Sequence, residues 1–188
     1  MENQTPLRTP RPESFTVEQG AMGLQITYRW FSAQYIFLAF FSLIWDAFLV
    51  FWYTMAFTSN APWIMFVFPL IHLAIGVGIT YTAVAGFLNR TTVTVGQGKL
   101  TIQHAPLYWP GNRTVASNDL TQLFTEERVT RSRNGTRVRY QLSMITRDDK
   151  KVRLISNLDE PDKARFLERK IEEYLGIENR TVEGETQR

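Results

Sequence analysis

Two long stretches of this chain carry almost no charge, and they restrict its possible folds more than any other feature. Residues 33–57 contain one charged side chain, Asp46, and residues 63–88 contain no Asp, Glu, Lys or Arg. A helix needs about 20 mainly apolar residues to cross the hydrocarbon core of a bilayer. Both stretches meet that length, and the short link between them makes the two helices antiparallel neighbours. The sequence therefore predicts a two-helix transmembrane hairpin over residues 33–88.

Basic residues on either side of this hairpin predict its orientation. Arg8, Arg11 and Arg29 precede the hairpin, Arg90 and Lys99 follow it, and the link contains none. Basic flanks stay on the cytoplasmic side of a membrane. We therefore expect a multi-pass protein of the bacterial inner (cytoplasmic) membrane, in contact with membrane lipids and with both termini in the cytoplasm.

Asp46 and His72 are ionisable residues inside the predicted helices. Such residues are costly in the membrane and usually face protein, where they have a partner. In an antiparallel hairpin the two positions fall within about 3 Å of each other along the axis. The sequence thus predicts an intramembrane polar pair, Asp46–His72. Three roles are open for it: a hydrogen bond that fixes helix register, a proton- or ion-linked function, and contact of Asp46 with another subunit.

The second apolar stretch also carries a row of small residues at successive fourth positions. This row consists of Ala74, Gly78, Thr82 and Gly86. Small side chains let another helix approach closely, so we expect a helix-packing face here. Pro69 lies near the start of the same stretch, where we expect it to kink the helix.

The remaining sequence alternates in the manner of β-strands. Val93 and Val95, then Leu100 and Ile102, follow a period of two on either side of a glycine-containing turn. Asn134–Gly135 is a strong hairpin signal. We expect seven strands, at 14–18, 24–30, 91–95, 99–103, 120–128, 136–147 and 151–155. An amphipathic helix follows, with Asp159 as its cap and Gly176 after its end.

The apolar residues of this last helix form one stripe, and its charged residues are expected to cover the exposed remainder. Those charged residues are Lys163, Glu168, Arg169, Lys170, Glu172 and Glu173. The patterns divide the chain into a disordered N-terminal tail (1–13), two N-terminal strands (14–32), the transmembrane hairpin (33–88), a cytoplasmic domain (89–176) and a disordered C-terminal tail (177–188).

Seven strands closed by a C-terminal helix resemble the bacterial pleckstrin-homology-like (PH-like) family of membrane-associated proteins. The resemblance rests on the GKLTI segment, the Trp109–Pro110 turn, the strand near Asn118–Phe124 and the closing LERKIEEYLGI. It implies a mainly β, PH-like barrel with the membrane hairpin inserted after the second strand. It also implies binding or scaffolding in place of catalysis. The first inter-strand loop, residues 19–23, contains no Lys or Arg, which departs from lipid-binding members of the superfamily.

Five arginines surround the Asn134–Gly135 turn: Arg128, Arg131, Arg133, Arg137 and Arg139. Such a cluster can attract an anionic membrane or an acidic partner, or it can be a solvated hairpin tip. An aromatic loop containing Tyr108 and Trp109 is either an exposed recognition or headgroup contact or an aromatic plug of the barrel.

No catalytic motif is present in the sequence, and there is no cysteine to serve as nucleophile or metal ligand. We expect no enzyme, no cofactor, no metal, no small-molecule substrate and no nucleic-acid partner. The leading expectation is a membrane-anchored binding or scaffold protein with a protein partner or a homo-oligomeric state. The alternatives are an accessory subunit of a larger membrane complex and a proton- or ion-linked role of the Asp46–His72 pair.

Overall fold

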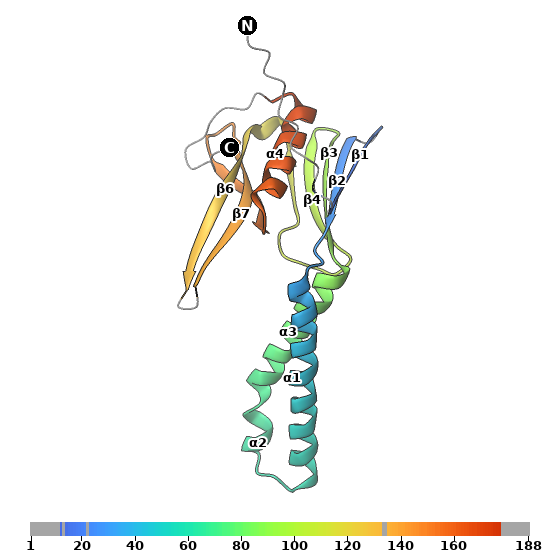
Figure 1. Cartoon of the computed structure of the whole chain (residues 1–188), viewed down its shortest axis with the longest axis vertical. Coiled ribbons are helices and arrows are strands. Elements are labelled where there is room, and N and C mark those ends of the chain that lie inside the picture. The colour runs from blue at the N-terminus through green and yellow to red at the C-terminus, as the bar shows by residue number, and fades with distance from the viewer. Residues whose placement is uncertain (1–11, 13, 22, 133–134, 178–188) are drawn as a thin grey trace. The chain divides into compact units, whose positions relative to one another are not determined.

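The structure is a computed structural model, and it describes residue 12 and residues 14–21, 23–132 and 135–177 (Figure 1). The chain forms two units. One is helical and comprises Arg29–Arg90 with Ala105–Leu107, and the other contains the strands and the last helix. The helices are α1 (Ala33–Thr58), α2 (Ile64–Val67), α3 (Leu70–Leu88) and α4 (Pro161–Leu175), with a short 3₁₀ turn, η1, at Ser117–Asp119. The expected tails at 1–13 and 177–188 lie almost wholly outside the described residues.

The strands form two antiparallel sheets. The first has the order β1 (Phe15–Gly20), β2 (Gly23–Arg29), β3 (Arg90–Gly96), β4 (Lys99–Ala105) and β5 (Arg113–Ala116). The second has the order β6 (Leu120–Ser132), β7 (Gly135–Thr146) and β8 (Lys151–Leu158). The strands before α1 therefore join the strands after α3 in one sheet, and the helical hairpin is an insertion between the neighbouring strands β2 and β3.

The described strands number eight, one more than the sequence analysis expected, and the two sheets do not close into a barrel. The additional strand is β5, whose polar residues give no alternating signal. It pairs with β4 along Lys99↔Ala116 to Ile102↔Arg113. The β unit therefore consists of two antiparallel sheets followed by a C-terminal helix, and the closed PH-like barrel that the sequence predicted is not formed by the described strands.

One apolar core joins both sheets to α4. Val93, Val95, Leu100 and Ile102 are almost completely buried, because period-two alternation places all four on the same face of the first sheet. The second sheet contributes Leu123, Leu142 and Met144, and α4 contributes Ala164, Phe166, Leu167 and Ile171. Ile177, assigned to a disordered tail by the sequence analysis, packs against this core.

The C-terminal helix α4 begins at Pro161 and ends at Gly176, which adopts a left-handed conformation with φ of 67°. Asp159 does not cap the helix as expected. Its carboxylate instead forms an ion pair with Lys163, with 2.9 Å between Asp159 Oδ1 and Lys163 Nζ. The expected exposure of two glutamates is also wrong, since Glu168 and Glu172 are 4% and 5% exposed. Glu168 accepts a 2.6 Å hydrogen bond from the Thr125 hydroxyl, so the helix is fastened to β6 by polar contacts as well as apolar ones.

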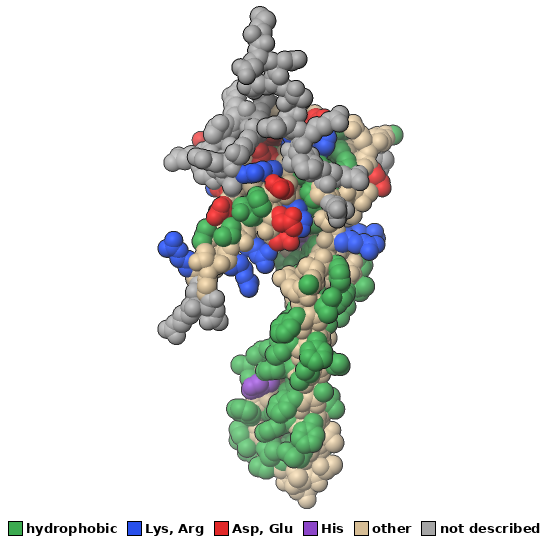
Figure 2. Space-filling view, viewed as in Figure 1, with side chains coloured by type: hydrophobic (Ala, Val, Ile, Leu, Met, Phe, Trp, Pro, Cys, Tyr) green, Lys and Arg blue, Asp and Glu red, His purple; other side chains and the backbone are tan. Residues whose placement is uncertain are grey.

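The helical unit is long and apolar enough to span a membrane. Ala33–Thr58 and Ile64–Leu88 have mean hydropathies of 1.9 and 2.0 in their most apolar windows. Only 11% of each window is buried inside the structure, far less than in the core helix of a globular domain. Figure 2 shows hydrophobic side chains gathered over these helices, while Lys, Arg, Asp and Glu gather over the β unit.

Candidate functional site

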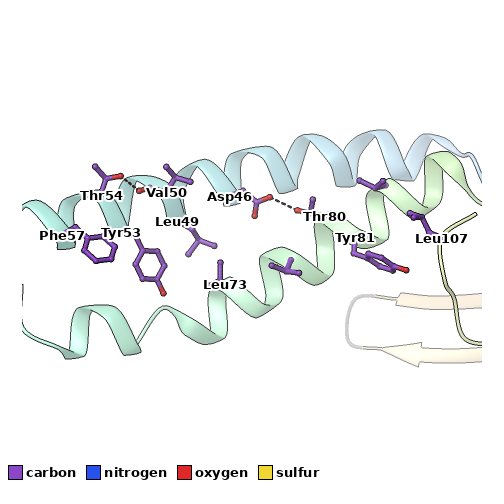
Figure 3. A pocket seen from close by; sticks show the side chains of 12 residues that line it. Asp46, Leu49, Val50, Tyr53, Thr54, Phe57, Leu73, Thr80, Tyr81 and Leu107 are labelled. Carbon is purple, nitrogen blue, oxygen red and sulfur yellow. Dashed lines mark hydrogen bonds between the residues drawn. The ribbon is translucent and has the colours of Figure 1, made fainter.

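An open groove runs along the helical hairpin between α1 and α3, with a volume of about 750 Å³ (Figure 3). Its walls are apolar apart from a few polar groups, of which Asp46 is the charged one. The lining residues are Asp46, Leu49, Val50, Tyr53, Thr54 and Phe57 of α1, Leu73, Val77, Thr80, Tyr81 and Val84 of α3, and Leu107. A mainly apolar cavity with few polar groups is the usual composition of a binding site.

Asp46 and Thr80 point toward each other across this groove (Figure 3). The Thr80 hydroxyl donates a 2.7 Å hydrogen bond to Asp46 Oδ2. The predicted Asp46–His72 pair is therefore not formed: the structure brings Asp46 to Thr80 instead.

The direction of helical side chains explains this difference. Side chains lean toward the N-terminus of their own helix. In an antiparallel hairpin, Asp46 therefore leans toward the later residues of α3, whereas the His72 side chain leans away, toward the connecting turn. Gly76 also lies beside Asp46 on α3, since an added Cβ there would lie 2.8 Å from Asp46 Oδ1. Thr80, one turn further on, leans back to meet the carboxylate.

His72 packs against rings. Its ring stacks on Trp45 at a centroid distance of 5.9 Å, and Phe68 lies 5.5 Å away. The Trp45 indole donates to the His72 carbonyl oxygen at 3.1 Å. His72 Nδ1 is buried and has no hydrogen-bond partner among the described residues. The described contacts of this residue thus run through its ring faces and its backbone.

Pro69 does more than kink the second stretch, because it divides it into α2 and α3. Proline has no N–H, so the carbonyl four residues earlier, that of Met65, lacks its usual helical donor. The Trp52 indole donates to that carbonyl at 3.0 Å. The Tyr53 hydroxyl donates to the next one, at Phe66, at 3.3 Å. Two aromatic residues of α1 therefore satisfy the backbone groups around the break, as an apolar environment requires.

The predicted row of small residues is divided between two environments. Gly86 lies against the Tyr35 ring in the hairpin contact, and an added Cβ would overlap that ring. Gly78 has nothing within 4 Å of an added Cβ. Ala74 is exposed, and Thr82 bonds the Gly78 carbonyl of its own helix at 2.7 Å. The hairpin contact uses Gly76 and Gly86, of which Gly86 belongs to the predicted row.

The predicted arginine cluster lies on the β6–β7 hairpin, except that Arg133 falls outside the described residues. Arg128 lies directly opposite Arg139, and Thr130 lies opposite Arg137. Arg131 lies opposite Thr136 and points to the other face of the sheet, because side chains alternate along a strand. The hairpin therefore places Arg128, Arg137 and Arg139 on one face.

Glu126, on that same face, forms a polar network that the sequence analysis missed. Its carboxylate accepts hydrogen bonds from Lys151, Gln141 and Ser143. Burial acts to raise the pKa of Glu126, but these donors lower it more, so the pKa lies below its usual value. Lys151 also lies 5.1 Å from the centre of the Phe124 ring. Separation along the sequence hides such a network, since its members come from three strands.

The aromatic loop places its two rings differently. Tyr108 is 76% exposed, whereas Trp109 is half-buried. Beside the loop, His104 Nδ1 lies 2.9 Å from the Thr91 hydroxyl, and burial lowers the pKa of His104. The backbone N–H of His104 donates to Asn112 at 2.7 Å. These contacts are those of a residue that orders a loop.

Asn89, at the end of α3, is a positioning residue without a sequence signal of its own. It is 1% exposed, and its amide exchanges two hydrogen bonds with the backbone of Leu107, at 2.8 and 3.0 Å. This pair of bonds holds Leu107 at the end of the groove. Only its position just after an apolar run, where helices commonly end, could have marked it.

No protein-family model matches this chain, and no curated protein matches it in sequence.

Proposed function

We propose that this chain is a non-enzymatic, membrane-anchored binding or scaffold protein that recruits a partner through the groove of its hairpin. In this proposal the hairpin spans the inner membrane, and the β unit is presented at its cytoplasmic face. The length and hydropathy of the helices support the first statement. The basic residues flanking the hairpin, among them Arg29 and Arg90, support the second.

We further propose that the β unit is a variant of the PH-like fold. A five-stranded sheet and a three-stranded sheet, one shared core and a C-terminal helix support this description. The inserted hairpin and the additional strand β5 are its distinguishing features. PH-like domains are mostly binding and scaffolding modules, but a fold does not by itself give a function. The choice of partner therefore rests on the hairpin groove.

The position of Asp46 carries this proposal. A carboxylate near the middle of a membrane helix costs roughly 2.5–3.5 kcal/mol on insertion scales, and such residues usually have protein partners. Among the described residues, its hydrogen-bond donor is the neutral hydroxyl of Thr80. The groove leaves space beside it for a further donor. A partner helix with a basic or hydrogen-bonding side chain at this depth would offset the cost of the carboxylate.

Charge complementarity favours a different protein over a second copy as that partner. The apolar stretches of this chain contain no Lys or Arg. A second copy could therefore supply neither a lysine nor an arginine from its own membrane helices, and its His72 ring is already packed against Trp45 and Phe68. The proposed occupant of the groove is a transmembrane helix of another protein with a basic residue, which makes this chain an accessory or recruiting subunit.

Photocrosslinking in intact membranes tests this proposal. A photoreactive residue replaces Val77, which is exposed and lines the groove, and in a second variant Ile71, which is equally apolar and exposed but does not line it. We expect an adduct of one defined mass from position 77 and none from position 71. The Asp46→Asn change in the position-77 variant should reduce the adduct, because it removes the charge that the partner recognises.

The mass of the adduct decides between the possible occupants. A mass equal to two copies would overturn the foreign partner and indicate a self-assembling scaffold. Lipid adducts alone at position 77 would contradict protein recruitment through the groove. Gly78→Leu is a further control, since Gly78 has open space around it and does not line the groove. If this change abolishes the adduct, the partner contacts the small-residue face instead.

A further inference from the structure

The outer face of the β6–β8 sheet carries three arginines around one polar pocket of about 230 Å³. Arg128 comes from β6, Arg139 from β7 and Arg153 from β8, so residues far apart in the sequence meet here. The other lining residues are Tyr140, Gln141, Ser156 and Asn157. The pocket lies entirely within the β unit and is independent of the hairpin groove.

Two of these arginines face each other directly. Arg128 and Arg139 are Cα partners in the antiparallel register of β6 and β7. Residues so paired lie side by side on one face of the sheet, and like charges in this position destabilise it. Arg139 is half-buried, which reduces the screening of its charge by water. An anion between the two guanidinium groups would turn this repulsion into attraction.

A carboxylate on this face, that of Glu126, is already engaged. Glu126 precedes Arg128 by two residues and shares its face, but it accepts hydrogen bonds from Lys151, Gln141 and Ser143. These contacts leave the positive charge of the three arginines uncompensated by Glu126. Arg113 adds further positive charge nearby, since its guanidinium donates to the Arg153 carbonyl oxygen at 2.7 Å.

We propose that this pocket is a phosphate-binding site formed by Arg128, Arg139 and Arg153. Guanidinium groups bind phosphate oxygens through paired, charge-assisted hydrogen bonds, and several such groups around one pocket match the geometry of a phosphate group. Ser156 and Asn157 line the same pocket, and their side chains carry neutral hydrogen-bond donors. Asn157 has a positive φ of 64°, so the strand is locally distorted where it borders the pocket. The phosphate belongs either to a soluble compound or to a lipid headgroup.

Phosphate binding can be measured on the full chain reconstituted in nanodiscs of neutral phosphatidylcholine. The probe is inorganic phosphate, its binding followed by ³¹P line broadening at constant ionic strength. Replacing any one of Arg128, Arg139 and Arg153 by Gln should weaken binding about tenfold or more, because each change removes charge-assisted hydrogen bonds. Arg131→Gln is the matched control, since it removes the same charge from the other face of the same hairpin. It should leave the affinity almost unchanged.

Two results would overturn the proposal. One is unchanged phosphate binding in the Arg139→Gln variant, and the other is an equal loss in the Arg131→Gln variant, which would indicate diffuse surface charge. Thermal unfolding in phosphate-free buffer distinguishes a loss of phosphate binding from a folding defect. In that buffer, Arg139→Gln should raise the melting temperature, because it relieves the repulsion between Arg128 and Arg139.

Nanodiscs containing phosphatidylglycerol distinguish the two sources of phosphate. If the wild type binds inorganic phosphate more weakly in phosphatidylglycerol than in phosphatidylcholine, and Arg139→Gln does not, the natural ligand is a lipid headgroup. If the wild type binds inorganic phosphate equally in both lipids, the natural ligand is a soluble compound.

Discussion

Replacing Gly86 by Ala should loosen the helical hairpin, whereas replacing Gly78 by Ala should not. Both glycines lie in α3, eight residues apart on the row of small residues. An added Cβ at Gly86 would overlap the Tyr35 ring of α1, and an added Cβ at Gly78 would meet nothing within 4 Å. The two substitutions are chemically identical and differ in the space that receives the methyl group.

The expected magnitude follows from two opposing effects. Overpacking a close contact costs about 1–3 kcal/mol, and Gly→Ala within a helix returns roughly 0.5–1 kcal/mol. The second effect is common to both variants and cancels in their difference. We therefore expect the Gly86→Ala hairpin to be about 1–3 kcal/mol less stable than the Gly78→Ala hairpin.

The absence of cysteine gives a direct assay of hairpin opening. Cysteines introduced at the exposed positions Phe37 and Leu88 carry a donor and an acceptor dye, one on each helix. Energy transfer is followed while SDS is added to the protein in dodecyl maltoside micelles. The Gly86→Ala variant should lose energy transfer at a lower SDS fraction than the wild type. Equal midpoints for Gly86→Ala and Gly78→Ala would refute the reasoning, because the hairpin contact would then not depend on Gly86.

Three other perturbations have defined outcomes. Thr80→Val removes the hydroxyl that donates to Asp46 and should destabilise the hairpin in the same assay by about 0.6 kcal/mol, the average for membrane hydrogen bonds; no change would mean that the bond contributes nothing. Glu126 has a lowered pKa, so its charge stabilises the fold above the usual glutamate pKa, and this contribution is lost as the pH falls through the lowered pKa. Glu126→Gln should flatten the acid side of a stability–pH profile measured by chemical denaturation, and an unchanged slope would contradict this. Gly23 has φ of 122°, and an added Cβ would overlap a carbonyl of β3, so Gly23→Ala should lower the melting temperature of the β unit, while Gly20→Ala, which has open space, should not.

Periodicity and length predicted the elements of this fold but not their assembly. The apolar stretches gave both long helices, and alternation at Val93, Val95, Leu100 and Ile102 identified a sheet face that is buried in the structure. These signals are local, since each depends on residues within one element. The strand β5 has no such alternation and could not be predicted this way.

The site residues depended on how elements meet, which local patterns do not specify. The expected depth of Asp46 in the hairpin identified the part of α3 that lies opposite it. The partner within that part is Thr80, because side-chain direction selects among residues at similar depth. The burial of Glu168 and Glu172 likewise depends on donors that β6 brings to α4. Charge alone predicted exposure for both residues, and the polar contacts of the folded chain reversed it.

The insertion of the hairpin between β2 and β3 has a consequence for the order of synthesis. A ribosome completes β1 and β2 first, but the sheet neighbour of β2 is β3, which emerges only after both helices have been made. Until then, one edge of β2 has unpaired backbone groups that can pair with another chain. If the hairpin spans a membrane as proposed, biogenesis of this protein should depend on the speed of hairpin insertion, and delayed insertion should expose the nascent chain to aggregation through its first two strands.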